Sequence, residues 1–285
     1  MISTIVVANG FNTSYLDSLL VAMFYKSSHL RSFLTQYPEK SKFIYLQELI
    51  NNNFINTIKN GYSVDTSIIN EIRNYSIVCG WKEGENIADL YSVIDYMKFL
   101  MHGIGFGQID FEFIEFNEFN NIENEKVKTM SMNYIDTIIS ENTNVKILLE
   151  KWYETNIKKP KTSNEHFRIL CNKFKEIPLM IPIFFNREKG TSYNVDIKKK
   201  IKFKKNNDSV QNNVSWIIHA LICFSSFGSG SYYSIINTDV DKWFLFSNEK
   251  IPSLIEIKIY DPEISNKIKQ ECILAIYRLD NLCKL

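Results

Sequence analysis

The hydrophobic period of the chain changes near residue 109, and this change constrains the fold more than any other feature of the sequence. Before it, apolar residues recur at spacings of three and four, as in residues 86–101, where one face of a predicted helix is apolar. From Ile109 onward apolar and polar residues alternate, which is typical of half-buried strands. Helices followed by many strands joined by hairpin-like turns predict an α+β fold.

The first third of the chain is predicted to be mostly helical. A short β-branched run at residues 4–8 precedes a helix that begins at Ser14, and helical spacing continues through residues 30–33 and 43–58, with breaks around Pro38 and at the run of three asparagines from Asn51 to Asn53. The remainder is predicted to contain one short helix at 145–153 and strands at 109–116 and 129–139, separated by a charged turn at 123–128. Further strands are predicted at 166–170, 179–185, 195–203, 214–224, 232–237, 243–246, 254–260 and 273–279.

Composition places the chain among ordinary globular proteins. Of its 285 residues, 45% are hydrophobic and 23% charged, and the formal net charge is +1. That charge gives no global field to attract nucleic acid or an anionic membrane, and the lysines at 198–200 are interpreted as a solvated face. No internal repeat or low-complexity linker is visible, so we expect one domain over residues 1–285.

Cysteine usage and hydropathy indicate the compartment. The five cysteines form no CxxC pair, which argues against a disulfide framework and against a zinc site. No apolar run has the length of a membrane span, and the first residues lack the pattern of a signal peptide. We therefore expect an intracellular protein of the cytoplasm or nucleus that binds neither membrane nor nucleic acid.

The polar turn before the first helix is a place where a nucleophile could sit. It reads Asn-Gly-Phe-Asn-Thr-Ser from Asn9 to Ser14, and the helix N-terminus directs its dipole and free N–H groups at the Ser14 side chain. A thiol there would have a lowered pKa, whereas a hydroxyl gains little unless a base removes its proton. The alternative is that Asn12, Thr13 or Ser14 simply caps the helix.

Five segments, in order along the chain, resemble the ubiquitin-specific proteases, a family of papain-like cysteine peptidases. Residues 9–20 are similar to the nucleophile box N-x-G-N-T-C-Y-x-N-S-x-L-Q, and residues 85–90 to the family's Q-D-A-x-E-F segment. Residues 176–187 resemble the strand L-P-x-x-L-x-I-x-L-x-R-F, and residues 275–279 resemble the closing A-Y-x-L-F-Y strand. Between them, the strand 214–224 followed by residues 228–234 and 243–248 resembles the histidine box, in which a strand leads to G-H-Y-x-x-Y and on to W-x-x-F-D-D.

The resemblance implies an architecture of thumb, fingers and palm in a compact version. The thumb would span about residues 1–108, the fingers about 109–178 and the palm about 179–285. Many members of the family carry zinc in the fingers on two CxxC pairs. Because only Cys171 lies near the corresponding place, we expect no metal and no other cofactor.

The resemblance also assigns roles to individual residues, and most of the expected chemistry is missing. Ser14 stands at the position of the nucleophilic cysteine, Ser231 at that of the histidine, and Ser247 at that of the orienting Asp or Asn, with Asn248 next to it. Serine has no basic lone pair near neutral pH that could serve as a general base. The oxyanion position alone keeps its residue, Asn9. The residues expected to meet the ubiquitin tail are Asn86, Asp89, Gly230 and Tyr232.

These substitutions predict a pseudoenzyme that hydrolyses little and binds ubiquitin, a ubiquitin-like protein or another protein partner. One alternative is a genuine cysteine deubiquitinase whose nucleophile was replaced by Ser14, although such a replacement would not explain Ser231. Another is a structural component of a larger assembly without ubiquitin binding. His219, surrounded by apolar residues in a predicted strand, is interpreted as a satisfied core histidine. Surface or packing roles are expected for His29, His102 and His166.

Overall fold

The structure is a computed structural model in which part of the chain is described. At residues 28–29, 111–119, 122–130, 153 and 166–173 the backbone alone is described. The described residues are 5–8, 10, 12–25, 28–35, 41–82, 92–105, 109–119, 122–153, 166–174, 176–187, 193–202, 214–225, 230–238 and 242–280.

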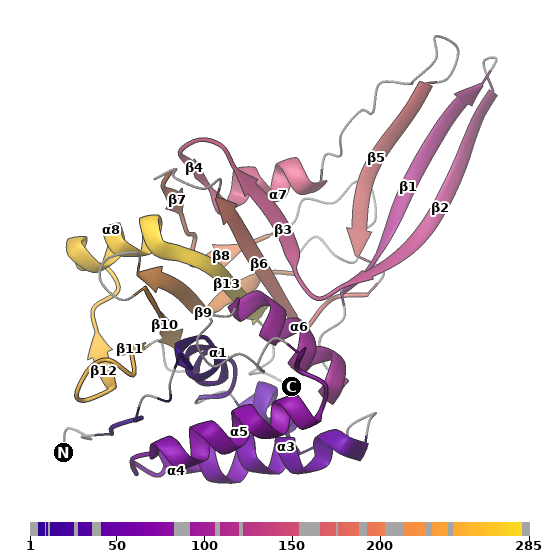
Figure 1. Ribbon diagram of the computed structural model, residues 1–285. Helices are drawn as coiled ribbons and strands as arrows, with labels where there is room; N and C mark the ends of the chain where they lie inside the picture. The colour runs from indigo at the N-terminus through magenta and orange to yellow at the C-terminus, as the bar shows by residue number, and fades with distance from the viewer. Residues whose placement is uncertain are drawn as a thin grey trace.

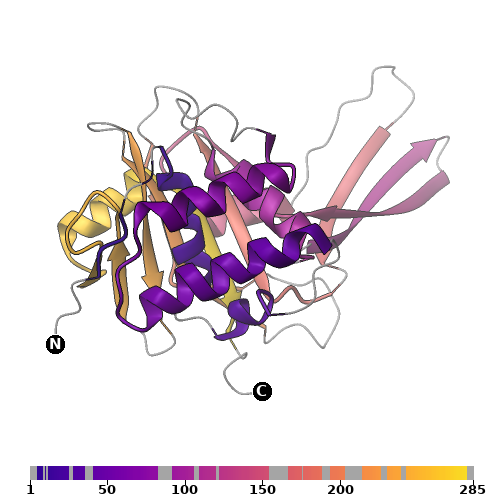
Figure 2. The ribbon, with the colours of Figure 1, turned by 60° about the horizontal axis from the view of Figure 1, so that its bottom comes forward.

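Helices in the first third of the chain enclose one central helix, α1 (Ser14–Phe24). Every residue of α1 is buried, which fits its apolar sequence, and it contacts both the sheet and the surrounding helices. Figure 2 shows helices of this region lying across one face of the sheet. The surrounding elements are α2 (Ser28–Ser32), η1 (Ser41–Phe43), α3 (Ile44–Glu48), η2 (Leu49–Ile55), α4 (Asn56–Lys59), α5 (Thr66–Val78) and α6 (Val93–Ile104).

Strands between residues 135 and 279 form an eight-stranded sheet, in the order β12-β11-β10-β9-β13-β6-β3, with β8 also paired to β9. All of these pairs are antiparallel except β3 with β6. The strands are β3 (Ile135–Ile139), β6 (Met180–Arg187), β8 (Lys200–Ile201), β9 (Trp216–Ser225), β10 (Ser231–Asn237), β11 (Trp243–Phe246), β12 (Leu254–Ile257) and β13 (Cys272–Leu279).

A three-stranded antiparallel sheet projects away from the body of the protein (Figure 1). It is made of β1 (Ile109–Phe119), β2 (Ile122–Met132) and β5 (His166–Phe174), with β1 in the middle. A two-stranded pair, β4 (Thr143–Asn144) with β7 (Val195–Asp196), lies near α7 (Val145–Tyr153). The last helix is α8 (Pro262–Glu271).

Two apolar cores lie on opposite faces of the large sheet. Strand β9 contributes to both, because successive side chains of a strand point to opposite faces. Ala220 and Ile222 pack in the first core with α1 and the other early helices. Leu221 and Cys223 pack in the second core with residues of α7 and α8. Ile218 also lies in the second core, because the pairing of β9 with β13 shifts register between residues 218 and 220. The two cores therefore share one sheet as their common wall.

The predicted α+β class agrees with this structure, and several local predictions were wrong. The predicted strand at 129–139 is divided between the end of β2 and β3, which belong to different sheets. The asparagine run does not break the helix, because residues 49–55 continue it as a π-helical turn. Residues 123–128 form part of β2 instead of a turn, since they pair in register with β1, Lys126 opposite Glu115 and Lys128 opposite Phe113. The predicted strand at 195–203 is two short strands, β7 and β8, joined by a bend.

Two helices were not identified individually from the sequence. Both have side-chain caps that could have marked them: Asp65 accepts a hydrogen bond from the Ser67 N–H at 2.8 Å at the start of α5, and Asp261 accepts one from the Glu263 N–H at 3.0 Å at the start of α8. Pro262 at the first helical position of α8 strengthens the second signal.

Candidate functional site

Ser14 is the first residue of α1, as its sequence predicted. Its side chain is buried, with 5% of the residue exposed. Thr13 occupies the N-cap position, yet no side chain there caps a backbone N–H. The Thr13 backbone carbonyl accepts hydrogen bonds from the N–H groups of Leu16 and Asp17, at 2.9 and 3.1 Å. The Thr13 side chain therefore does not cap this helix.

The Ser14 hydroxyl joins α1 to strand β10. Its oxygen accepts a hydrogen bond from the Tyr232 backbone N–H at 3.2 Å, across 218 residues of sequence. Ser231, the residue before Tyr232, begins β10 and is 9% exposed. The structure therefore brings together the two sequence positions proposed for nucleophile and base.

Gly230 sets the entry of the chain into β10. Its φ is +67°, in the left-handed region that favours glycine. A Cβ at this position would also lie 3.3 Å from the Phe224 ring, which packs on the Tyr232 ring at a centroid distance of 4.9 Å. Burial raises the pKa of the Tyr232 hydroxyl, and a hydrogen bond with the Val93 backbone opposes this rise. Tyr232 consequently reaches from β10 to the start of α6.

Asp17 lies one helical turn after Thr13, and the sequence interpretation missed it. Its Oδ2 accepts a hydrogen bond from the Asn248 amide at 2.6 Å and one from the Thr13 hydroxyl at 3.2 Å. The carboxyl is fully enclosed, and burial raises its pKa from 3.8 to about 7 against the lowering effect of those two hydrogen bonds. One signal was available: Asp17 stands where the nucleophile box has Asn, and Asn248 stands where the histidine box ends in Asp.

Ser247 and Asn248 form the turn after β11. The Ser247 hydroxyl accepts a hydrogen bond from the Glu249 N–H at 3.3 Å, and the Ser247 N–H donates to the Ser253 carbonyl at 2.9 Å. Ser253 in turn holds the chain before α1, because its hydroxyl accepts a hydrogen bond from the Val7 N–H at 3.0 Å. Asn248 thus reaches the helix start through Asp17, whereas Ser247 is engaged in shaping the turn.

The described histidine near α1 does not serve Ser14. His219 on β9 is 1% exposed, and its Nε2 lies 3.3 Å from the Met23 carbonyl at the far end of α1. A ring nitrogen that donates to a carbonyl cannot at the same time act as a base. The interpretation of His219 as a core histidine is confirmed. The His102 side chain is exposed, and the side chains of His29 and His166 lie outside the described part of the structure.

Other predicted site residues lie outside the described residues. These are Asn9, Asn86 and Asp89, so their roles stay predictions. Among the described side chains no group of three metal-ligating residues is close enough to hold a metal ion, and Cys171 is not one of those side chains. Within the described residues, no helix combines the length and the apolar character needed to cross a membrane.

The fold consists of helices packed on the large sheet, a projecting three-stranded sheet, and a helix start that faces β10. This fold is similar to that of the ubiquitin-specific-protease type of deubiquitinase. One matching structure is the SAGA deubiquitinating module of Ubp8, Sgf11, Sus1 and Sgf73 bound to monoubiquitin, with a TM-score of 0.69, 12% identity, and coverage of 97% of this chain and 69% of that one. A second, the same module bound to ubiquitin aldehyde, matches with a TM-score of 0.68, 11% identity and the same coverages. No protein family and no curated protein matches the sequence.

Proposed function

We propose that this chain is a catalytically silent protein of the ubiquitin-specific-protease fold that binds ubiquitin or a ubiquitin-like protein. The observation that carries the proposal is the contact between Ser14 and the residue after Ser231. Positions that would hold a thiol and an imidazole in a cysteine peptidase carry two hydroxyl side chains. The fold similarity to ubiquitin-bound Ubp8 supports ubiquitin as the partner.

The local chemistry supports the loss of catalysis. A serine nucleophile needs a base within hydrogen-bond reach to remove its proton. The hydrogen bond that reaches the Ser14 oxygen comes from a backbone N–H, which is a donor and cannot accept a proton. Asp17 has a pKa suited to a general base, but its Oδ2 is engaged by Asn248 and Thr13. Nothing described at this site would activate the hydroxyl.

The proposal extends to the subregions and the tail site. Residues 1–108 would be the thumb, 109–178 the fingers and 179–285 the palm, in keeping with early helices, a projecting sheet and a large sheet. The tail of the partner would pass Gly230 and Tyr232, and on the other side Asn86 and Asp89. The reach of Tyr232 to the Val93 backbone supports this, since residues 86–89 come shortly before α6.

Ubiquitin binding and ubiquitin hydrolysis test the proposal separately. The unaltered chain is expected to bind ubiquitin in a calorimetric titration, to leave a ubiquitin–fluorophore conjugate intact and to escape labelling by a ubiquitin C-terminal electrophile. Turnover by the unaltered chain would overturn it. Members of a catalytic triad act as a unit, and loss of the base alone costs on the order of a million-fold. Ser14→Cys alone is therefore expected to stay inactive in turnover.

A graded set of variants distinguishes the alternatives. Ser14→Cys with Ser231→His, and then with Ser247→Asp as well, restores the triad residues stepwise, and Ser14→Ala is the matched control. Efficient turnover by Ser14→Cys alone would indicate a deubiquitinase that lacks only its nucleophile. An absence of ubiquitin affinity, together with a large stable oligomer by sizing, would instead favour a structural component of an assembly.

A further inference from the structure

A cavity of about 190 Å³ lies on the face of the large sheet opposite α1. Its floor is formed by Ile218 and Leu221 of β9 and by Trp243 of β11, each at most 7% exposed, and Ile268 of α8 closes one side. All four belong to the second core. The cavity is consequently separate from the Ser14 site, and what it binds is independent of the function proposed above.

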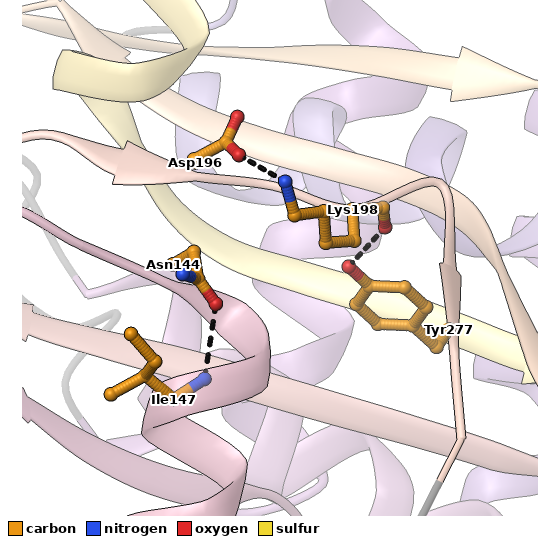
Figure 3. Close-up of polar contacts among 5 residues, drawn as sticks. All are labelled: Asn144, Ile147, Asp196, Lys198 and Tyr277. Atoms are coloured by element: carbon orange, nitrogen blue, oxygen red, sulfur yellow. Dashed lines mark hydrogen bonds and ion pairs between the residues drawn. The ribbon is translucent and has the colours of Figure 1, made fainter.

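The lining of this cavity includes charged residues. Asp196, Lys199 and Lys269 are among its walls. Asp196 forms an ion pair with Lys198, whose backbone carbonyl accepts a hydrogen bond from the Tyr277 hydroxyl at 2.7 Å, so this turn is tied to β13 (Figure 3). The charge of Asp196 is offset by Lys198, so the two lysines give the cavity lining a net positive formal charge.

The position of Lys269 is fixed by the helix that carries it. The Arg187 guanidinium donates a hydrogen bond to the Lys269 carbonyl at 3.0 Å and another to the Cys272 carbonyl, which anchors the end of α8 to β6 and β13. Lys199 is held through its own backbone, because its carbonyl accepts a hydrogen bond from the Ile218 N–H at 2.9 Å. The backbone of both lysines is therefore anchored at the wall of the cavity.

The size of the cavity limits the ligand. A dry apolar cavity of about 150 Å³ accommodates benzene, so this one has room for a single six-membered ring with a short substituent. An apolar floor with an indole ring favours an aromatic group, and lysines in the lining favour an anion. We propose that the cavity binds a small aromatic carboxylate, with its ring over Trp243 and Ile268 and its carboxylate between Lys199 and Lys269.

Phenylacetate is the probe, and phenylacetamide is its neutral match. The protein is labelled with ¹⁵N at its four tryptophans, and the indole N–H signal of Trp243 is assigned as the one absent in Trp243→Phe. Phenylacetate is expected to shift this signal saturably, and phenylacetamide to bind more weakly. The variant Lys199→Gln with Lys269→Gln is expected to raise the Kd for phenylacetate about tenfold, the size expected of two exposed ion pairs.

Control variants distinguish binding in the cavity from non-specific binding elsewhere on the protein. Lys59→Gln removes an exposed lysine on α4 and should leave the Kd unchanged. Ser265→Trp on α8 places a ring into the cavity and should abolish binding, whereas Ser265→Ala should retain it. The proposal is overturned if phenylacetate does not shift the Trp243 signal saturably, if the amide binds as tightly as the acid, or if the double lysine variant binds unchanged.

Discussion

The Asp17 carboxyl is enclosed between α1 and the turn after β11, and within the described residues it forms no ion pair. Its two hydrogen bonds come from neutral groups, which compensate only part of the cost of burying a charge. Between pH 3.8 and about 7, the Asp17 carboxyl is protonated in the folded protein but ionised in the unfolded chain. Asp17 therefore makes stability depend on pH near neutrality.

The sign of this dependence is opposite to that of an ordinary salt-bridged carboxylate. The contribution of Asp17 is fully present below pH 3.8 and is lost as the pH rises to about 7. The shift corresponds to about 4 kcal/mol in the free energy of unfolding. Asp17→Asn, which keeps the shape and accepts the same two hydrogen bonds, is expected to be more stable than the unaltered chain at pH 8, with a difference that shrinks toward pH 4 in urea unfolding.

Asp280 provides the opposite control. Its hydrogen bond with Lys200 holds the pKa of its carboxyl below the usual value, so its contribution is present above the unfolded pKa and is lost as the pH falls. Asp280→Asn should therefore lose most stability relative to the unaltered chain above pH 4 and least at low pH. A difference between Asp17→Asn and the unaltered chain that does not change with pH would contradict the role assigned to Asp17.

An exchange of Asp17 and Asn248 tests the hydrogen bond between them. Asn248→Asp places a second carboxylate 2.6 Å from the first, and near neutral pH the pair must share a proton or repel. We expect a loss of about 3 to 5 kcal/mol in the free energy of unfolding, typical of an uncompensated buried charge. Adding Asp17→Asn should recover most of this loss, as measured by a double-mutant cycle in urea. Additive losses would show that the two side chains are not coupled.

At the scale of residues, the sequence predicted where the first helix begins but could not supply the contacts made there. The start of α1 at Ser14 was predictable because the residues around it have a helical period and a polar turn before them. The hydrogen bond from Tyr232 to Ser14 was not, because it joins residues 218 apart. Asp17 was missed for the same reason, since the cause of its raised pKa is burial against a turn 231 residues away.

At the scale of elements, α6 and η1 approach each other through a glycine. A Cβ on Gly103 of α6 would overlap the edge of the Phe43 ring, which is 2% exposed and packs on the Phe99 ring at a centroid distance of 5.3 Å. Glycine normally weakens a helix interior relative to alanine, so its presence here reflects this close approach.

Gly103→Ala is therefore expected to destabilise the protein although alanine is the better helix former. Overpacking a filled core costs about 1 to 3 kcal/mol, which exceeds the gain in helix propensity of about 1 kcal/mol. The midpoint of urea unfolding should fall. His102→Ala, at the exposed neighbouring position, should have little effect, and Phe43→Leu added to Gly103→Ala should recover part of the loss. An increase in stability on Gly103→Ala alone would rule out the close approach.

Element boundaries were predictable where the local pattern and the tertiary structure agree. The helix α7 and the strand β11 have the predicted bounds, because their apolar periods continue up to their ends. Residues 123–128 of β2 were not recognised as a strand, because they are mostly charged and show little apolar alternation. Their place in the sheet depends on pairing with β1, which supplies the register. The π-helical turn at residues 49–55 was not predictable, because asparagine usually interrupts a helix.

For the whole molecule, the projecting sheet and the body differ in how they are supported. The body has two cores that share the large sheet, whereas the projecting sheet extends from it at one end (Figure 1). Ile109 and Phe174, which are both buried, anchor this sheet to the second core. The tip of the β1–β2 hairpin lies at the far end, where Phe119 pairs with Ile122.

Shortening this hairpin should leave the body folded. Residues 116–125 are replaced by a two-residue Asn-Gly turn that joins Glu115 to Lys126, a pair already opposite each other in the register. Thermal unfolding followed by circular dichroism should remain a single cooperative transition with a Tm within a few degrees of the original, since the buried anchors remain. The comparison is Phe174→Ala, which removes an anchor and should lower the Tm more. A large loss of Tm on shortening would show that the hairpin tip supports the body.

The amide and the carboxylate that meet at the start of α1 also determine which exchanges of side chain this site tolerates. The motifs that residues 9–20 and 228–248 resemble have Asn and Asp at these positions, and this chain has Asp17 and Asn248. Two substitutions convert one arrangement into the other. If Asn248→Asp is made first, two carboxylates face each other at hydrogen-bond distance, and if Asp17→Asn is made first, two amides do. Two amides can hydrogen-bond without a buried charge, whereas two carboxylates repel. Asp17→Asn alone therefore leaves two amides at this site and should give a protein whose stability depends less on pH, whereas an exchange of both residues keeps one buried carboxyl.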